Sequence, residues 1–177
     1  MRRTMNIFYL HPNPRKCARW ACDKHVVKML LETCQLLYTC HWVLGSDLGT
    51  APCRKGSAER GYKKNNPNHP CGKWVRASLQ HYEWLAQYGL ELLREYGFRY
   101  KGKTHACGEH IRWLCAHPPP GLADAGWGAP ACAMPDQYKT GNPVTSYRKY
   151  YMGEKTHILT YTGRHLPHWL AARTRTV

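Results

Sequence analysis

Three side chains of one stretch, His25, Lys28 and Glu32, have the types and the spacing that acid–base chemistry uses. On a helix these positions lie on one face, and Lys24 falls on the same strip. An imidazole that titrates near neutral pH, an ammonium group and a carboxylate would then lie within reach of one another. The alternative is a solvated strip in which Lys28 and Glu32 form an ordinary ion pair worth a few tenths of a kcal/mol.

The stretch that carries these residues is predicted to be a buried helix. No Gly or Pro occurs between residues 21 and 43, and at about 100° per residue the apolar side chains cover an arc of roughly 220°. These apolar residues are Val26, Val27, Met29, Leu30, Leu31, Cys34, Leu36, Leu37 and Tyr38. A surface helix usually buries a narrower stripe. We therefore expect a central core helix, capped by Asp23, whose polar strip faces a cleft or another polar group.

Other parts of the chain supply further candidates for a site. His69 and Asp136 could add a second imidazole and a second carboxylate for acid–base catalysis. The residues expected to bind a substrate combine aromatic rings with cations: Trp74, Arg76, Tyr138, Lys139, Tyr147, Arg148 and Tyr151. In such a set a guanidinium can fork onto a phosphate while a Tyr ring stacks on a base. The alternative is that the rings pack in the core and the cations are solvated.

The charge of the chain favours a polyanionic partner. Lys and Arg number 26 against 11 Asp and Glu, a formal net charge of +15, in a chain whose residues are 43% hydrophobic. This excess, in a protein with enough apolar residues for a core, favours nucleic acid or a nucleotide as partner. A protein partner is an open alternative.

The sequence gives no sign of a membrane or secretory protein. There is no apolar run of about 18 residues and no basic amphipathic anchor helix, so no membrane partner is expected. The N-terminus lacks the apolar region of a signal peptide. We therefore expect an intracellular protein, in a host cytoplasm or nucleus, that is not secreted.

The nine cysteines are expected to be free and mostly buried thiols. Structural zinc sites normally use short Cys-x2-Cys knuckles, and none occurs in this chain. The odd count and the missing secretory signal argue against a disulfide framework. We expect no bound metal and no cofactor.

Turn signals and apolar periodicity predict a mainly α fold, with four to five helices around the central one and at most a short strand near Ile7. A short helix from Pro14 is expected to merge with the central helix, and a later one to begin at Pro143 with Asn142 as its cap. Two more helices are predicted over residues 71–97 and 105–116.

The length of 177 residues suits one compact domain, which we place at residues 5–170. A loose extension is expected at residues 1–4 and a basic tail at residues 171–177. Residues 45–68, rich in Gly, Asn, Pro and basic side chains, are predicted to form a long basic loop that closes over a ligand, follows a phosphate backbone, or is simply solvated.

Five segments together resemble a family of small, mostly uncharacterised proteins of tailed bacteriophages and large DNA viruses. They are Met5-Asn6-Ile7-Phe8, Cys22-Asp23-Lys24-His25-Val26-Val27-Lys28-Met29, Asn68-His69-Pro70 with Trp74, Met134-Pro135-Asp136-Gln137-Tyr138-Lys139, and Tyr147-Arg148-Lys149-Tyr150-Tyr151. The resemblance extends over nearly the whole chain and implies a viral or phage-like origin and a single compact domain. It carries over no catalytic role, and this chain differs from the family in its many additional cysteines.

The first functional hypothesis is an enzyme that acts on nucleic acid or nucleotides, at a phosphodiester or a glycosidic bond. Carboxylates are scarce and scattered, which makes a two-metal nuclease less attractive than metal-free chemistry. His25 or His69 would then serve as general acid or base. A glycosylase would use Glu32 or Asp136 as its carboxylate and a Lys as an amine nucleophile.

Two alternatives come from other classes of protein. One is a non-catalytic basic protein that binds nucleic acid through backbone contacts and stacking. The other is a viral effector that binds a host protein or a small phosphorylated ligand. The sequence leaves the three open, although the enzyme best explains polar residues on so apolar a helix.

Overall fold

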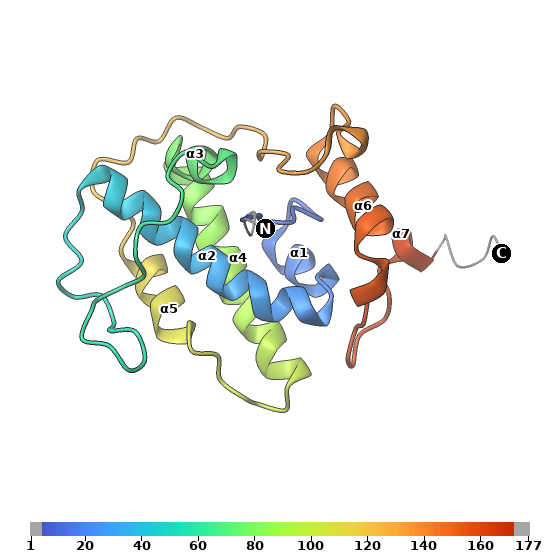
Figure 1. The fold of residues 1–177 in the computed structure, drawn as a ribbon, viewed down its shortest axis with the longest axis horizontal. Helices are drawn as coiled ribbons and strands as arrows, with labels where there is room; N and C mark the ends of the chain where they lie inside the picture. Colours follow the sequence, from blue (N-terminus) through green and yellow to red (C-terminus); the bar gives the residue numbers. More distant parts are fainter. Residues whose placement is uncertain (1–4, 172–177) are drawn as a thin grey trace.

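The computed structural model describes residues 5–171, and in that range the fold is mainly helical (Figure 1). The α-helices are α1 (Pro14–Trp20), α2 (Asp23–Leu44), α3 (Pro70–Arg76), α4 (Leu79–Arg99), α5 (Gly108–Ala116), α6 (Pro143–Glu154) and α7 (His168–Ala171). Two 3-10 turns, η1 (Asp136–Tyr138) and η2 (Thr156–Ile158), flank α6. No β-strand occurs among the described residues, which confirms the mainly α prediction.

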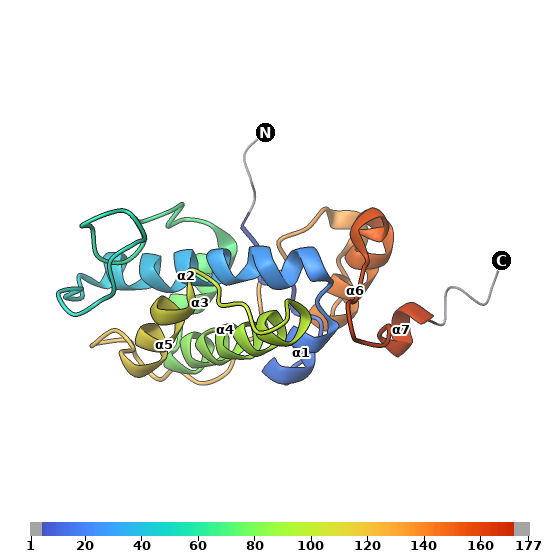
Figure 2. The ribbon, with the colours of Figure 1, turned by 90° about the horizontal axis from the view of Figure 1, so that it is seen from below.

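Two long helices, α2 and α4, form the centre of the fold. They cross in Figure 1, and Figure 2 shows α2 in one layer with α4, α1 and α5 in the other. The side chains between these layers are large and fully buried, among them Met29, Leu30, Leu37, Leu85 and Tyr88. Because each such side chain contributes about 1.5–3 kcal/mol on burial, this contact holds the two layers together. The helix predicted as central therefore occupies that place.

The ends of α2 follow from local chemistry, with one correction. The helix ends where Gly45 takes a left-handed conformation, φ 67°, and its N–H bonds back to His41. Asp23 was expected to be the cap, but Cys22 occupies that position and Asp23 is the first helical residue. The Asp23 carboxylate instead accepts hydrogen bonds from Arg99 and Thr162, so it ties α2 to α4 and to the C-terminal segment.

The buried face of α2 also differs from the prediction. Val27 and Leu31 were assigned to the apolar arc but are 37% and 38% exposed, whereas His25 and Glu32 from the polar strip are 3% and 5% exposed. The reason is tertiary. Residues 5–10 are buried beside α2 and cover His25 and Glu32, whereas Lys24 and Lys28 of the same strip stay exposed. Residues 5–10 have no regular secondary structure, so the short strand near Ile7 does not form.

Three predicted helix boundaries are wrong for identifiable reasons. The single helix over residues 71–97 is two helices, because Ser78 has an extended backbone and its side chain caps the start of α4. The helix from Pro14 does not merge with α2, since Ala21 and Cys22 are extended. The helix placed at residues 105–116 begins only at Gly108.

The remaining chain wraps around this core. The loop at residues 45–68 lies along the C-terminal half of α2, where Thr39 and Asn65 exchange two hydrogen bonds. Residues 117–135 return past α3 to α6, whose start is capped by the Asn142 side chain as predicted. The predicted extension at residues 1–4 and most of the basic tail, residues 172–177, lie outside the described residues. In residues 5–171 there is no helix with the length and apolarity needed to cross a bilayer.

Candidate active site

The candidate active site is centred on the carboxylate of Glu32, in the middle of α2. Its side chain is 6% exposed, and each oxygen has a partner: the Asn6 backbone N–H donates to Oε2 at 3.0 Å and Lys28 Nζ lies 3.0 Å from Oε1. Lys28 is 45% exposed, so the carboxylate lies directly beneath a solvent-accessible ammonium group. A buried carboxylate with a single, half-exposed cationic partner retains much of its negative potential.

The backbone that surrounds Glu32 comes from three distant parts of the chain. Asn6 holds the N-terminal segment in place because its side-chain amide donates to the Ala133 carbonyl at 2.7 Å. The start of α3 is also close, since the negative charge of Glu32 adds to burial in raising the pKa of the Cys71 thiol to about 12. The Asn6 backbone and the start of α3 therefore lie close to this carboxylate, and Ala133 is linked to it through Asn6.

His25 lies one turn before Lys28, but it is a buried and neutral group. Its Nδ1 is 2.5 Å from the Tyr151 hydroxyl, and the Phe8 ring stacks on the imidazole with 4.2 Å between centroids. Burial lowers the pKa of His25 to about 3, and the charges of Lys28 and Lys155 act in the same direction. The imidazole is therefore uncharged at neutral pH and can exchange a proton only through its hydrogen bond or after a rearrangement.

Phe8 has a backbone conformation that indicates strain. Its φ is 47°, in the left-handed region that residues other than Gly rarely adopt. The ring lies between His25 and Tyr150, and the Lys155 ammonium group lies 4.8 Å from the Tyr150 ring centre. Strained residues of this kind concentrate at functional sites, where the surrounding structure holds them in place.

The other acid–base candidates lie in different environments. His69 caps α3, with its Nδ1 accepting the Cys71 N–H, and burial lowers its pKa. Asp136 is fully exposed in η1 and forms a 2.7 Å ion pair with Lys139, which lowers the pKa of Asp136. Lys24 is exposed in the first turn of α2.

The predicted substrate-binding residues are spread over α3, η1 and α6, and most of them have structural partners. Trp74 stacks on His81 and donates to the Gly128 carbonyl, and Arg76 donates to the Pro67 carbonyl. Tyr138 donates to Glu154 at 2.8 Å. None of the contacts among the described residues joins these side chains to Glu32.

The predicted residues of α6 face two directions. Tyr147 and Tyr151 are fully buried, and the Tyr147 hydroxyl donates to the Ala131 carbonyl at 2.7 Å. Arg148 points elsewhere: it donates to the Leu10 carbonyl, and its guanidinium lies 4.9 Å from the Trp20 ring centre. The two Tyr side chains are thus buried packing groups, and their rings are not available to stack on a base from solvent.

Sequence reasoning missed Asn6 and Phe8, which contact Glu32 and His25 respectively. Both lie in a short apolar run, which predicts only a strand or a buried extended segment before the first helix. No group of three metal-binding side chains occurs within residues 5–171, and all nine cysteines carry free thiols.

A buried carboxylate beside a cation, in a mainly helical protein of net charge +15, favours a polyanionic partner such as nucleic acid. Residues 5–107 match the family described as pyrimidine dimer DNA glycosylase. This is more than half of the chain, and the protein belongs to that family. The match includes the whole Glu32 site except residues 131–133 and the residues of α6. No curated protein and no solved structure gives a significant match.

Proposed function

We propose that this protein is a DNA glycosylase that breaks the N-glycosidic bond of a damaged pyrimidine nucleotide, with Glu32 as the catalytic carboxylate. The observation that carries the proposal is the setting of Glu32: buried, bonded to a backbone N–H, and paired only with the half-exposed Lys28. The family to which the chain belongs supports the bond and the substrate class. A phage or large-virus origin, implied by the sequence resemblance, is part of the same proposal.

The chemistry requires a negative charge beside the sugar. When the base departs with the bonding electrons, positive charge develops on the deoxyribose ring, and a fixed carboxylate stabilises it. Because Glu32 is desolvated, its field acts through a low local dielectric and exceeds that of a carboxylate in water. Asn6 holds one oxygen in place through its N–H, so the carboxylate is oriented before substrate binds.

An amine route accounts for the neighbouring cation. In that route Lys28 transfers one proton to Glu32, and its free Nζ attacks C1′ of the sugar as the C1′–N bond breaks. The base leaves with the bonding electrons and takes a second proton from Nζ. The C1′–O4′ bond then breaks as the nitrogen lone pair forms the imine, and Glu32 returns its proton to O4′. In the alternative route Glu32 directs a water to the same carbon. The 3.0 Å contact of Lys28 with Glu32 is compatible with either route.

Access to a buried carboxylate requires the nucleotide to leave the duplex. Enzymes that act on a base turn the nucleotide out of the stack, at an energetic cost of a few kcal/mol that is smaller for damaged bases. Beside Lys28, α2 presents the exposed apolar side chains of Val27 and Leu31. Apolar side chains are suited to filling a gap between base pairs, and we assign these two to the DNA-facing surface of α2.

The decisive experiment uses an end-labelled duplex with one cyclobutane pyrimidine dimer, under single-turnover conditions with and without EDTA, and hot alkali converts each abasic site into a strand break before electrophoresis. Glu32→Gln should lower the cleavage rate by roughly 10²–10⁴ while duplex affinity changes little, because the amide keeps the shape but not the charge. Glu83→Gln is the matched control, since Glu83 is exposed on α4. If wild-type protein binds the damaged duplex but leaves it intact, the glycosylase proposal is wrong and a binding protein is favoured.

The same substrate separates the two routes. Reduction with borohydride traps an imine as a covalent protein–DNA adduct, and peptide mapping locates the attached amine. An adduct on Lys28 that disappears in Lys28→Gln supports the amine route from this residue. An adduct that persists in Lys28→Gln assigns the amine to another group of the chain, which the mapped peptide would identify.

A further inference from the structure

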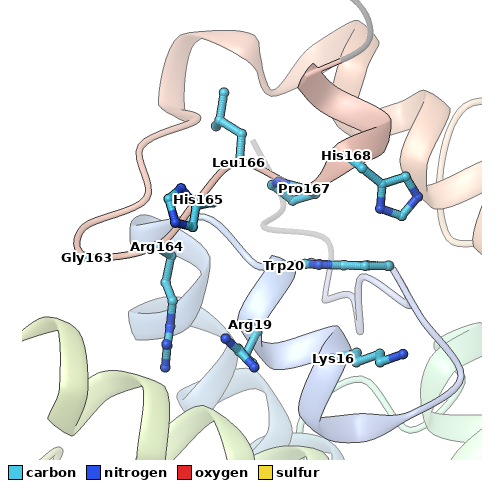
Figure 3. A pocket seen from close by; sticks show the side chains of 9 residues that line it. All are labelled: Lys16, Arg19, Trp20, Gly163, Arg164, His165, Leu166, Pro167 and His168. Atoms are coloured by element: carbon cyan, nitrogen blue, oxygen red, sulfur yellow. The ribbon is translucent and has the colours of Figure 1, made fainter.

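A second feature of the molecule, lined by none of the residues that contact Glu32, has the chemistry of an anion-binding site. It is a cavity of about 480 Å³ between α1 and the segment that leads into α7, lined mainly by Lys16, Arg19, Trp20, Arg164, His165 and His168 (Figure 3). We call it the α1–α7 pocket. It lies at the end of the molecule that carries α6 and α7.

The charge of the α1–α7 pocket is uncompensated. Lys16 and Arg19 lie one turn apart on α1, are exposed, and form no ion pair within residues 5–171. His165 and His168 add two exposed imidazoles from the opposite wall. No Asp or Glu lines the pocket, so nothing in it competes for a ligand with negative charge.

The wall opposite α1 is held in place rather than loosely attached. Arg164 is bound by Glu95 through two hydrogen bonds of 3.0 and 2.7 Å, and its guanidinium lies 3.7 Å from the Phe98 ring centre. Thr162 is anchored to the Asp23 carboxylate by its N–H and its hydroxyl. Because Arg164 is already neutralised by Glu95, its contribution is to position the wall, and Lys16 and Arg19 remain to bind a ligand.

Trp20 provides an apolar side to the α1–α7 pocket. Its ring contacts the His168 ring edge-on at 5.4 Å between centroids, and Arg148 lies over it at 4.9 Å. An apolar surface beside free cations displaces water and strengthens their interaction with an anion. Figure 3 shows the Trp20 ring between the residues from α1 and those from the C-terminal wall.

We propose that the α1–α7 pocket binds a phosphate group of the DNA backbone, outside the damaged nucleotide, through Lys16 and Arg19. The proposal rests on the proposed function for the choice of DNA as the source of the phosphate. A phosphodiester suits the pocket because a guanidinium and an ammonium group on one helical turn can share the oxygens of one phosphate or contact two successive ones. Free inorganic phosphate or a mononucleotide carries the same chemistry, and the test separates these sources.

The test compares two double variants that each remove one Lys and one Arg. Lys16→Ala/Arg19→Ala removes the free cations of the pocket, whereas Lys103→Ala/Arg112→Ala removes two exposed cations near the start of α5. Affinity for an undamaged duplex is measured by fluorescence anisotropy over a range of salt concentrations. Loss of one or two phosphate contacts should flatten the slope of log K against log salt by about 0.9 for each contact. The slope of the control variant should stay that of the wild type.

An unchanged salt slope in the Lys16→Ala/Arg19→Ala variant would overturn the proposal. An equal change of slope in both double variants would also overturn it, because the effect would then follow from the lower net charge and not from the pocket. Titration of the free protein with inorganic phosphate and with a mononucleotide forms the second arm. Tight binding of either, lost in the pocket variant while the duplex slope is unchanged, would assign the pocket to a free phosphate ligand. Because the duplex has no lesion, these outcomes do not depend on whether Glu32 is catalytic.

Discussion

Two buried glutamates of this protein, Glu32 and Glu95, show how similar burial can serve different purposes. Glu95 is 4% exposed and is bound by Arg99 at 3.1 Å and by two bonds from Arg164, so its charge is fully compensated. Glu32 is 5% exposed and has only a backbone N–H and the half-exposed Lys28. Burial alone therefore does not identify a catalytic carboxylate, and the proposal for Glu32 rests on its exposed cationic partner together with its position in the segment that matches the glycosylase family.

The surroundings of the two glutamates support this distinction. The Arg99 side chain at Glu95 is fully buried, and it also pairs with Asp23 and donates to the backbone of Arg19 and Ala21. That network joins α4, α1, the start of α2 and the C-terminal segment. At Glu32 the equivalent cation is at the surface, where a ligand can displace it or use it.

The largest expected effect that would test this comparison is on the free energy of unfolding, which should depend strongly on Glu95 and only weakly on Glu32. Glu95→Gln should lower the free energy of unfolding by about 3–5 kcal/mol, because the buried Arg99 loses a compensating charge. Glu32→Gln should change the free energy of unfolding by less than about 1.5 kcal/mol, since a neutral amide can still accept the Asn6 N–H. Urea unfolding of both variants measures the two values. Comparable destabilisation by both substitutions would mean that Glu32 is a structural group as well.

Much of the fold was accessible from the sequence because α2 and α6 carry local signals. The uninterrupted apolar stretch after residue 21 and the Asn142–Pro143 start are properties of neighbouring residues, and both elements form. The break at Ser78 was missed because the helical pattern of residues 71–97 continues through it. A capping side chain decides that boundary, and a window of apolar periodicity does not detect it.

The candidate site was accessible only in part, for a physical reason. The sequence brings His25, Lys28 and Glu32 onto one helical strip, but which of them meet solvent depends on residues 5–10, far away in sequence. Val27 and Leu31 are exposed because that segment occupies the other face of α2. Asn6 and Phe8 complete the site through contacts whose partners are 26 and 17 positions away, which no local pattern encodes.

A smaller effect, on the pH dependence of the free energy of unfolding, is expected from His25. This side chain is buried in its neutral form, whereas the two glutamates are buried as charged groups with cationic partners. Its pKa is lowered to about 3, while an unfolded histidine titrates near 6.5. Between these values the unfolded state binds a proton that the folded state does not, so the free energy of unfolding should fall as the pH falls through this window. The slope from this group is at most about 1.4 kcal/mol per pH unit, and it vanishes above the window.

Urea unfolding of wild type and His25→Gln, repeated from about pH 7 down to about pH 5, isolates this contribution. His41, whose pKa burial lowers to about 4, has the same sign and is present in both proteins, so it cancels in the comparison. The variant should be the less sensitive of the two to acid. Equal sensitivity would show that His25 becomes protonated without unfolding, and that the imidazole is available for proton transfer after all.

The smallest expected effect concerns Asp136, the other carboxylate that the sequence offers for catalysis. Its side chain is 94% exposed and its one ionic partner, Lys139, lies three residues away on the same turn. A carboxylate in water is screened, so it can stabilise a developing cation far less than Glu32 can. Asp136→Asn should therefore leave the cleavage rate of the damaged duplex within about twofold of the wild-type rate, against the 10²–10⁴ expected for Glu32→Gln. A loss at Asp136 as large as that at Glu32 would show that η1 moves over the bound DNA, and that a carboxylate exposed in the free protein becomes buried only in the complex.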